Sequence, residues 1–211
     1  FRFVFVSLVL SPSTLAFTES RKDPLATILD PLVEQKQIPG YYFLVEKDGE
    51  KVYERAKGYA DENSELLPSN NTLYSVQGFT SIFTALAILR MVDEGVISFS
   101  DPVSKYIPEF AELTVAPKGS YQTELESPKG EVTINHLLTH TSGLTRAQGG
   151  TAGEVAEAYR LTGVMTMEAL IESTWGDLAG QVEALTQLPL VSHPGESFQP
   201  SNGYDVLGRI I

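Results

Sequence analysis

The most apolar stretch of the chain after residue 16 runs from Ile82 to Val92, where only two residues are strongly polar. A helix that is apolar nearly all round is normally the buried centre of a domain. Two acidic residues end the run, and Gly95 suits a left-handed C-terminal cap. We therefore predict a central helix within Leu73–Gly95, and we expect this well-buried element to hold the polar turn at Gly78–Ser81.

The segment before this helix predicts one amphipathic helix and one β-hairpin. Apolar residues at helical spacing mark a helix over Pro24–Gln37, with Asp23 as its N-cap. Tyr41–Glu46 and Lys51–Arg55 are strand-like and flank an Asp48-Gly49 turn signal. Two strands alone are marginally stable, so we expect the sheet to be incomplete in this chain.

The rest of the chain predicts mostly short helices. The predicted helices or helical turns cover Val103–Phe110, Thr133–Thr139 (with Thr133 as N-cap), Glu154–Tyr159, Thr166–Glu172, Leu178–Leu185 and Tyr204–Ile211. Ala111–Gly130 is a polar excursion with several Pro and Gly residues, which predicts a surface loop or hairpin. The order is helix, hairpin and then helices, so the fold class is α+β.

Composition excludes several function classes. The 211 residues carry a formal net charge of −12, whereas nucleic acids and anionic membranes select clustered Lys and Arg. The chain has no cysteine, so disulfides, thiol nucleophiles and cysteine metal sites are excluded. We predict no cofactor and no metal. A polar loop contains Asn70-Asn71-Thr72, a glycosylation sequon that has meaning only in a eukaryotic host.

The two ends of the chain carry further signals. Arg2 precedes the short apolar run Phe3–Leu10, and small residues follow at Thr14 and Ala16. This pattern predicts a signal peptide over residues 1–16 and a periplasmic or secreted protein, although a buried first strand remains an alternative. The apolar run is too short for a stable membrane span. The missing initial Met and the uncapped end at Ile211 predict a fragment of a longer protein.

Five segments in this order resemble one family, the β-lactamase-related serine hydrolases. This family includes class C β-lactamases, penicillin-binding DD-peptidases and esterases. The segments are Asp48-Gly49, Leu73–Gly95, Ser98–Phe110 (SFSDPVSKYIPEF), Val132–Leu144 (VTINHLLTHTSGL) and Pro194–Gly208 (PGESFQPSNGYDVLG). The resemblance implies a β-lactamase/transpeptidase-like fold, in which a helical domain is inserted into an α/β domain with an antiparallel sheet. Residues 17–72 would then belong to the α/β domain, and residues 73–211 would form the central helix and helical domain, ending before the late strands.

The resemblance also implies a chemistry, acyl transfer to a serine. In the family a Ser-x-x-Lys motif opens the central helix, and a Tyr from a Tyr-Ser motif completes the proton relay. The same frames here hold Gly78 at the nucleophile position, Ser81 at the base position and Pro200 at the Tyr position. All three reactive side chains are therefore replaced, while their neighbours match the family.

The resemblance places a possible pocket lining around these positions. The residues concerned are Gln77, Phe79, His140, Ser201 and Asn202. Their ligand would be a small acyl compound or a peptidoglycan-like molecule. We predict a serine hydrolase family member that is inactive as written; a non-catalytic periplasmic binding protein for a peptidoglycan- or ester-like ligand is the alternative.

Other residues were weighed as substitutes for the lost groups. Ser75 and Ser81 have no Lys or His within four residues to activate them, so backbone contacts at a helix start are the expected role. His136 and His140 are four residues apart, a spacing that can hold zinc on one helical face, but the glutamate of an H-E-x-x-H motif is absent. Tyr204 is expected to face away from position 200, and Trp175 is expected in the core or at the rim.

Overall fold

The computed structural model describes residues 23–61, 63, 65–117, 120, 124–146, 153–164 and 177–211. The predicted signal peptide, the predicted helix at Thr166–Glu172 and Trp175 lie outside these residues. The chain divides into two compact units, one up to Ser75 and one from Val76 onward. Each unit is described separately below.

The first unit opens with helix α1, Pro24–Glu34, as the sequence predicted. Asp23 caps it, because its Oδ1 accepts hydrogen bonds from the backbone N–H groups of Leu25 and Ala26 at 3.0 and 3.2 Å. The helix ends in a Schellman motif around Lys36, whose φ of 55° is left-handed. A lysine therefore occupies a position that usually selects glycine.

Strands β1 (Gly40–Lys47) and β2 (Glu50–Gly58) form the predicted antiparallel hairpin. The turn residues Asp48 and Gly49 both have positive φ, 53° and 80°, which is the conformation that an Asp-Gly turn signal predicts. The pairing runs from Gly40 opposite Gly58 to Lys47 opposite Glu50 and is interrupted by an irregularity after Val45. These two strands are the only sheet in the described part of the chain.

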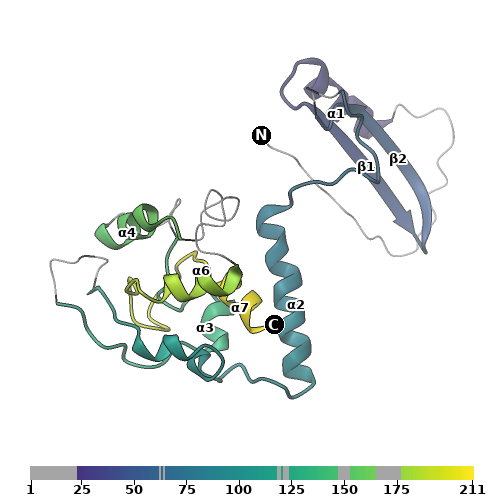
Figure 1. Cartoon of the computed structure of the whole chain (residues 1–211). Helices are drawn as coiled ribbons and strands as arrows, with labels where there is room; N and C mark the ends of the chain where they lie inside the picture. Colours follow the sequence, from purple (N-terminus) through teal and green to yellow (C-terminus); the bar gives the residue numbers. More distant parts are fainter. Residues whose placement is uncertain are drawn as a thin grey trace. The chain divides into compact units, whose positions relative to one another are not determined.

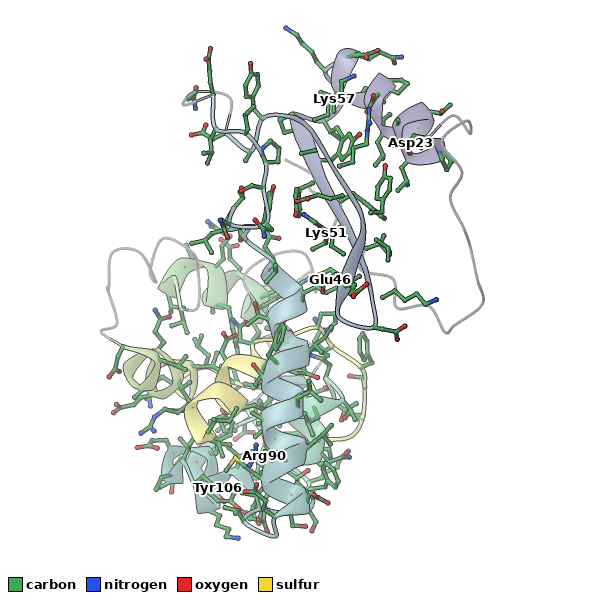
Figure 2. All side chains as sticks on the ribbon, turned by 90° about the vertical axis from the view of Figure 1, so that its right-hand side faces the viewer. Asp23, Glu46, Lys51, Lys57, Arg90 and Tyr106 are labelled. Atoms are coloured by element: carbon green, nitrogen blue, oxygen red, sulfur yellow. The ribbon has the colours of Figure 1, made fainter. Side chains whose placement is uncertain are left out.

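A network of charged and phenolic groups fastens α1 to the hairpin (Figure 2 labels Asp23 and Lys57). Arg55 donates to Asp30 Oδ2 at 2.6 Å and to the Tyr41 hydroxyl at 2.8 Å. The Tyr41 hydroxyl in turn donates to Asp30 Oδ1 at 2.6 Å. Hydrogen bonds from Tyr41 and then Arg55 lower the pKa of Asp30 to about 2. The carboxylate of Asp30 is thus the centre of the contact between helix and hairpin.

The second unit contains the remaining helices (Figure 1). They are the 3₁₀ helices η1 (Gln77–Phe79), η2 (Val103–Lys105) and η3 (Pro108–Glu112), and the α-helices α2 (Thr80–Asp93), α3 (Ile134–Leu138), α4 (Glu154–Thr162), α6 (Leu178–Leu185) and α7 (Gly203–Ile210). Each α-helix matches a predicted helix to within a few residues. Gly95 has a φ of 72°, and the N–H groups of Gly95 and Val96 bond back to Val92 and Met91, so the predicted left-handed cap of α2 is confirmed.

The core of this unit lies where α3, α6 and α7 meet. Its fully buried side chains include Ile134, Leu137, Leu185 and Leu207. Helices α3 and α7 approach closely at Gly203, where a Cβ would lie 3.2 Å from the Leu137 carbonyl oxygen. The helical part of the chain therefore builds a hydrophobic core of its own.

The prediction that α2 is the best-buried element is wrong for the described structure. Ile88 is the only residue of α2 that is fully buried, and it faces the core, with Met91 and Val92 packed beside it. Five apolar residues on the rest of the helix are exposed, namely Phe79 at its start, Ile82, Phe83, Leu86 and Leu89. An apolar pattern shows that α2 has apolar faces, but those faces are buried only where other elements cover them. Among the described elements, α7 is the main helix packed on α2, so the other faces of α2 stay exposed.

The predicted surface excursion at Ala111–Gly130 is also partly wrong. Leu113, Val115 and Ala116 are buried in the core. Val115 pairs with Glu126 through two backbone hydrogen bonds of 2.8 and 2.9 Å, which agrees with the hairpin alternative. The many polar residues of the segment led to the prediction of an exposed loop, although residues 113–116 near its start are mostly apolar and include the paired Val115.

Candidate functional site

The position that the resemblance assigns to the nucleophile lies in η1, directly before α2. Gly78 is the middle residue of this short 3₁₀ helix. Among the described residues, no atom beyond its own neighbours lies within 4 Å of the point where a Cβ on Gly78 would be. The preceding residue, Gln77, has a φ of 44°, an unusual conformation for a residue with a side chain. The backbone thus forms a sharp turn with room for a side chain that is missing.

The same turn presents the start of a long helix. A helix start carries the positive end of the helix dipole, which favours developing negative charge. Two N–H groups at this start already have partners, since that of Phe79 donates to the Val76 carbonyl oxygen at 3.0 Å and that of Thr80 donates to the carbonyl oxygens of Gln77 and Gly78. Ser81, at the family's base position, is half-buried on the first turn of α2. Phe79 is 62% exposed beside it. The local groups are therefore backbone N–H groups, a hydroxyl and a phenyl ring, and none of them is a base.

The two histidines considered for zinc do not share a helical face. Helix α3 ends at Leu138, and His140 lies beyond it with a left-handed φ of 55°. His136 belongs to a capping box: its Nδ1 accepts a hydrogen bond from the Thr133 N–H at 3.2 Å, while its own N–H donates to Thr133 Oγ1 at 3.3 Å. Among the described residues, no three His, Asp or Glu side chains are grouped so that they could hold a metal ion together. His136 stabilises a helix start instead.

His140 packs against the segment that carries the family's Tyr-Ser frame. Its ring lies 5.8 Å from the ring of Phe198 and 5.2 Å from that of Tyr204. Its carbonyl oxygen accepts a hydrogen bond from the Gln199 N–H at 2.7 Å. Burial, with a smaller contribution from the charge of Arg146, lowers the pKa of His140. The imidazole is therefore neutral near pH 7, and its Nδ1 is buried without a partner among the described residues.

The frame itself contains no phenol at the expected position. Pro200 is half-buried in extended chain before α7. Ser201 Oγ accepts a hydrogen bond from the Gly203 N–H at 3.3 Å, and Asn202 occupies the N-cap position of α7. The Tyr204 hydroxyl donates to the Leu138 carbonyl oxygen at 3.1 Å. This hydrogen bond ties α7 to the end of α3, so Tyr204 serves the fold and does not replace the lost Tyr.

The structure places one predicted pocket residue, His140, against the segment that carries the Tyr-Ser frame. His140 lies with Phe198, Gln199 and Tyr204, as the hydrogen bond and the ring contacts show. None of these residues lies within 4 Å of the position that a Cβ on Gly78 would take. The pocket-lining roles of Gln77, Phe79, Ser201 and Asn202 stay predictions.

One titratable residue near the frame was missed by sequence analysis. Asp205 lies on the first turn of α7, and burial raises the pKa of its carboxyl group, partly offset by a hydrogen bond with Asn202. A single acid within α7, directly before the apolar pair Val206 and Leu207, was the available signal. Its neighbours Val206 and Leu207 are fully buried.

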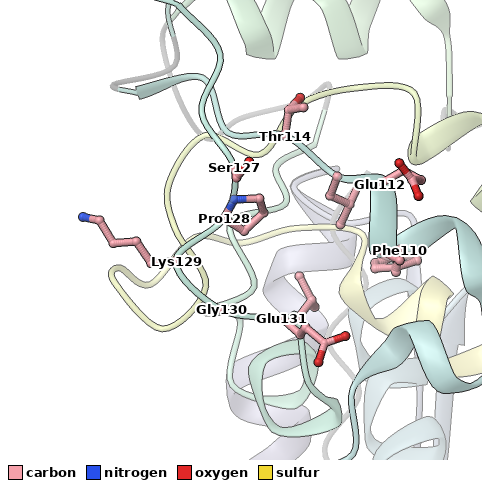
Figure 3. Close-up of a pocket in the computed structure, with 11 residues that line it drawn as sticks. Phe110, Glu112, Thr114, Ser127, Pro128, Lys129, Gly130 and Glu131 are labelled. Carbon is pink, nitrogen blue, oxygen red and sulfur yellow. The ribbon is translucent and has the colours of Figure 1, made fainter.

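The described structure also contains a groove beside η3 (Figure 3). It is a groove of about 460 Å³ between the end of η3 and the loop that leads to α3. Its walls include Phe110, Glu112, Lys129 and Glu131. None of the three reactive positions, Gly78, Ser81 and Pro200, lines this groove. The Glu131 carboxylate in its wall accepts a hydrogen bond from the Ser104 hydroxyl at 2.8 Å.

These contacts restrict the chemistry that the site supports. Acyl transfer to a serine needs a nucleophile and an adjacent base within hydrogen-bonding reach. The described residues of the frame offer hydroxyls at Ser81 and Ser201 and a half-buried imidazole at His140, but no amine at the base position. The helix start and the open space at Gly78 are the parts of an acyl-transfer site that remain.

Comparison with known proteins places these observations in a family. The profile described as Beta-lactamase matches residues 25–211. Esterase EstB from Burkholderia gladioli is 29% identical over 187 residues, which are 89% of this chain and 44% of EstB. A penicillin-binding protein homologue from Pyrococcus abyssi is 30% identical, with a TM-score of 0.56 over 88% of this chain and 37% of its own. The hydrolase EstCE1 has a TM-score of 0.67 at 24% identity over 88% of this chain and 45% of its own, which supports the fold.

The chain spans less than half the length of each of these relatives. Within that span the matches confirm the expected fold class, β-lactamase/transpeptidase-like, here with helices and a two-stranded antiparallel sheet. The profile covers both described units and includes every frame position discussed above. The chain belongs to the β-lactamase-related serine hydrolase family.

Proposed function

We propose that this chain keeps the scaffold of a serine acyl-transfer site but forms no acyl-enzyme. The observation that carries the proposal is the set of residues at the three reactive positions, Gly78, Ser81 and Pro200. Glycine has no nucleophile, serine cannot act as an amine base and proline cannot relay a proton. The relatives named as esterase and hydrolase indicate the chemistry that the scaffold serves elsewhere in the family.

The surrounding groups support this proposal because none of them supplies a nucleophile with a base beside it. The Tyr204 hydroxyl is bonded to a backbone carbonyl oxygen. The His140 ring packs against the rings of Phe198 and Tyr204, and its buried Nδ1 has no hydrogen-bond partner among the described residues. Ser81 has a hydroxyl, but an alcohol with its ordinary pKa is a weak nucleophile without an adjacent base. We therefore expect that activated acyl compounds do not acylate the chain.

Acylation is the direct test. The chain is incubated with a fluorescent penicillin and, separately, with a fluorophosphonate probe, with an active serine esterase as the reagent control. We expect no covalent label on this chain. A labelled peptide that contains Ser75 or Ser81, identified by mass spectrometry, would refute the proposal.

Variants separate the missing nucleophile from the missing base. Gly78→Ser has room for its side chain, yet we expect it to remain unlabelled because Ser81 cannot activate it. The matched variant Gly78→Ser with Ser81→Lys places an amine one helical turn after the hydroxyl. If Gly78→Ser alone is labelled as fast as the variant that also carries Ser81→Lys, a group other than the lysine acts as the base.

A binding role is the second candidate. The open space at Gly78, the exposed Phe79 and the helix start support a site that holds a small acyl or peptidoglycan-like ligand without reacting. We propose an extracytoplasmic setting, periplasmic or secreted, for such a binder. No helix among the described residues has the length and apolar character needed to cross a membrane. Calorimetric titration with a D-Ala-D-Ala peptide tests this role, and Gly78→Trp, which fills the open space, is the control expected to abolish any binding.

A further inference from the structure

The polar loop before the second unit contains a feature that neither the family frames nor the proposed function uses. Asn70-Asn71-Thr72 matches N-x-[ST], the acceptor sequence for N-linked glycans. The chain has five asparagines, and Asn70 is the only one followed two residues later by Ser or Thr. The question for the structure is whether this asparagine could carry a glycan in the folded protein.

The sequon lies in a tight turn that holds its threonine and leaves its asparagine outside. The Thr72 N–H donates to the Ser69 carbonyl oxygen at 3.1 Å. Thr72 Oγ1 accepts a hydrogen bond from the Ser69 N–H at 3.0 Å and lies 3.2 Å from Ser69 Oγ. Asn70 and Asn71 are exposed at the tip of this turn. A group attached to the Asn70 amide nitrogen would therefore extend into solvent without breaking the turn.

The surface on either side of the turn offers an independent reason for a glycan. Leu66 and Leu67 precede the turn and are 52% and 66% exposed, and Leu73 follows it and is 98% exposed. Pro68, between these leucines and the turn, is buried and anchors the loop. A bulky, hydrated glycan beside three exposed leucines would shield apolar surface from association with other chains.

We propose that Asn70 is an N-glycosylation site, used when the chain enters a eukaryotic secretory pathway. The acceptor is the amide nitrogen of Asn70, and the donor is a lipid-diphosphate-linked oligosaccharide. The nitrogen forms a bond to the anomeric carbon, the bond from that carbon to the diphosphate breaks, and the amide loses one proton as the lipid diphosphate leaves. The proposal depends on entry into that pathway and is independent of whether the chain forms an acyl-enzyme.

The test expresses the chain in a eukaryotic secretory host, once with its own N-terminal segment and once behind a leader of the host. Glycan is detected by the mass change on digestion with peptide N-glycosidase, and the site is read from the Asn-to-Asp conversion in heavy-oxygen water. We expect modification of Asn70, loss of it in Asn70→Gln and Thr72→Ala, and retention in Thr72→Ser and the matched Asn71→Gln.

The result that overturns the proposal is wild-type chain in the lumen or medium with an unmodified Asn70. Material retained in the cell is analysed in the same way, because the glycan is added on entry to the lumen, so poor secretion still gives an answer. Modification with the host leader alone would support Asn70 as the acceptor and contradict the predicted signal peptide.

Discussion

Gly143 is the position where one added methyl group should have the largest effect on the candidate site. Its φ is 84°, and a Cβ there would lie 2.1 Å from the Ser192 carbonyl oxygen and 3.2 Å from Leu190 Cβ. The clash is difficult to relieve, because the Val191 N–H donates to the Gly143 carbonyl oxygen at 2.8 Å and holds the same two segments together. These segments connect the turn at His140 with the chain that leads to Pro200.

The expected cost of Gly143→Ala combines two effects. A left-handed backbone costs a residue with a Cβ about 1–2 kcal/mol, and forcing a methyl group into a filled site costs about 1–3 kcal/mol more. Gly95→Ala is the matched control, since Gly95 has a φ of 72° but open space around its Cβ position. It should cost the backbone part alone, about 1–2 kcal/mol.

Urea unfolding followed by far-UV circular dichroism measures both variants, because most of the helices belong to the second unit. The free energy of unfolding of Gly143→Ala should lie below that of Gly95→Ala by about 1–3 kcal/mol. Equal values within about 0.5 kcal/mol would refute the close approach at Ser192, because surface substitutions commonly differ by that much.

Two further predictions concern the first unit. Hydrogen bonds from Tyr41 and Arg55 lower the pKa of Asp30 to about 2 from 3.8. The carboxylate therefore stabilises the folded state above about pH 4, and this contribution is lost as the pH falls towards 2. Asp30→Asn should show a smaller loss of unfolding free energy across that range, and an acid titration of stability that is the same in the variant and the wild type would contradict the assignment. Lys36→Gly should raise the midpoint of thermal unfolding and add about 0.5–1 kcal/mol to the free energy of unfolding, because glycine adopts the left-handed φ of 55° without strain. Gln35→Gly, at a φ of −85°, is the control and should lower the midpoint.

The local signals in the sequence predicted the elements well because their causes are local. Asp23 caps α1 through N–H groups two and three residues away, and the Asp48-Gly49 turn is set by two backbone conformations. Gly95 ends α2 for the same kind of reason. The match of Leu178–Leu185 to α6 shows that apolar spacing can also fix helix bounds.

Features that depend on distant residues were beyond such signals. The exposure of Phe83 on α2 depends on which elements pack against that helix. The sequence predicted no metal at His136 and His140 and assigned no other role to His136, whereas in the structure His136 caps its own helix through Thr133. The need for glycine at position 143 comes from Ser192, almost 50 residues away in the chain. The empty nucleophile position was predicted because the flanking residues of Gly78 preserve the family register.

The contacts that hold the candidate site together do not involve the three replaced positions. The Gln199 N–H bonds to the His140 carbonyl oxygen, the Gly195 N–H bonds to the Thr141 carbonyl oxygen and the Tyr204 hydroxyl bonds to the Leu138 carbonyl oxygen. Each of these bonds joins the segment around the Tyr-Ser frame to the end of α3, and none requires a reactive side chain. Replacement of the three reactive side chains therefore leaves these folding contacts intact. This separation explains how the chain can retain the family's fold signals around Gly78 and Pro200 while the groups for acyl transfer are absent.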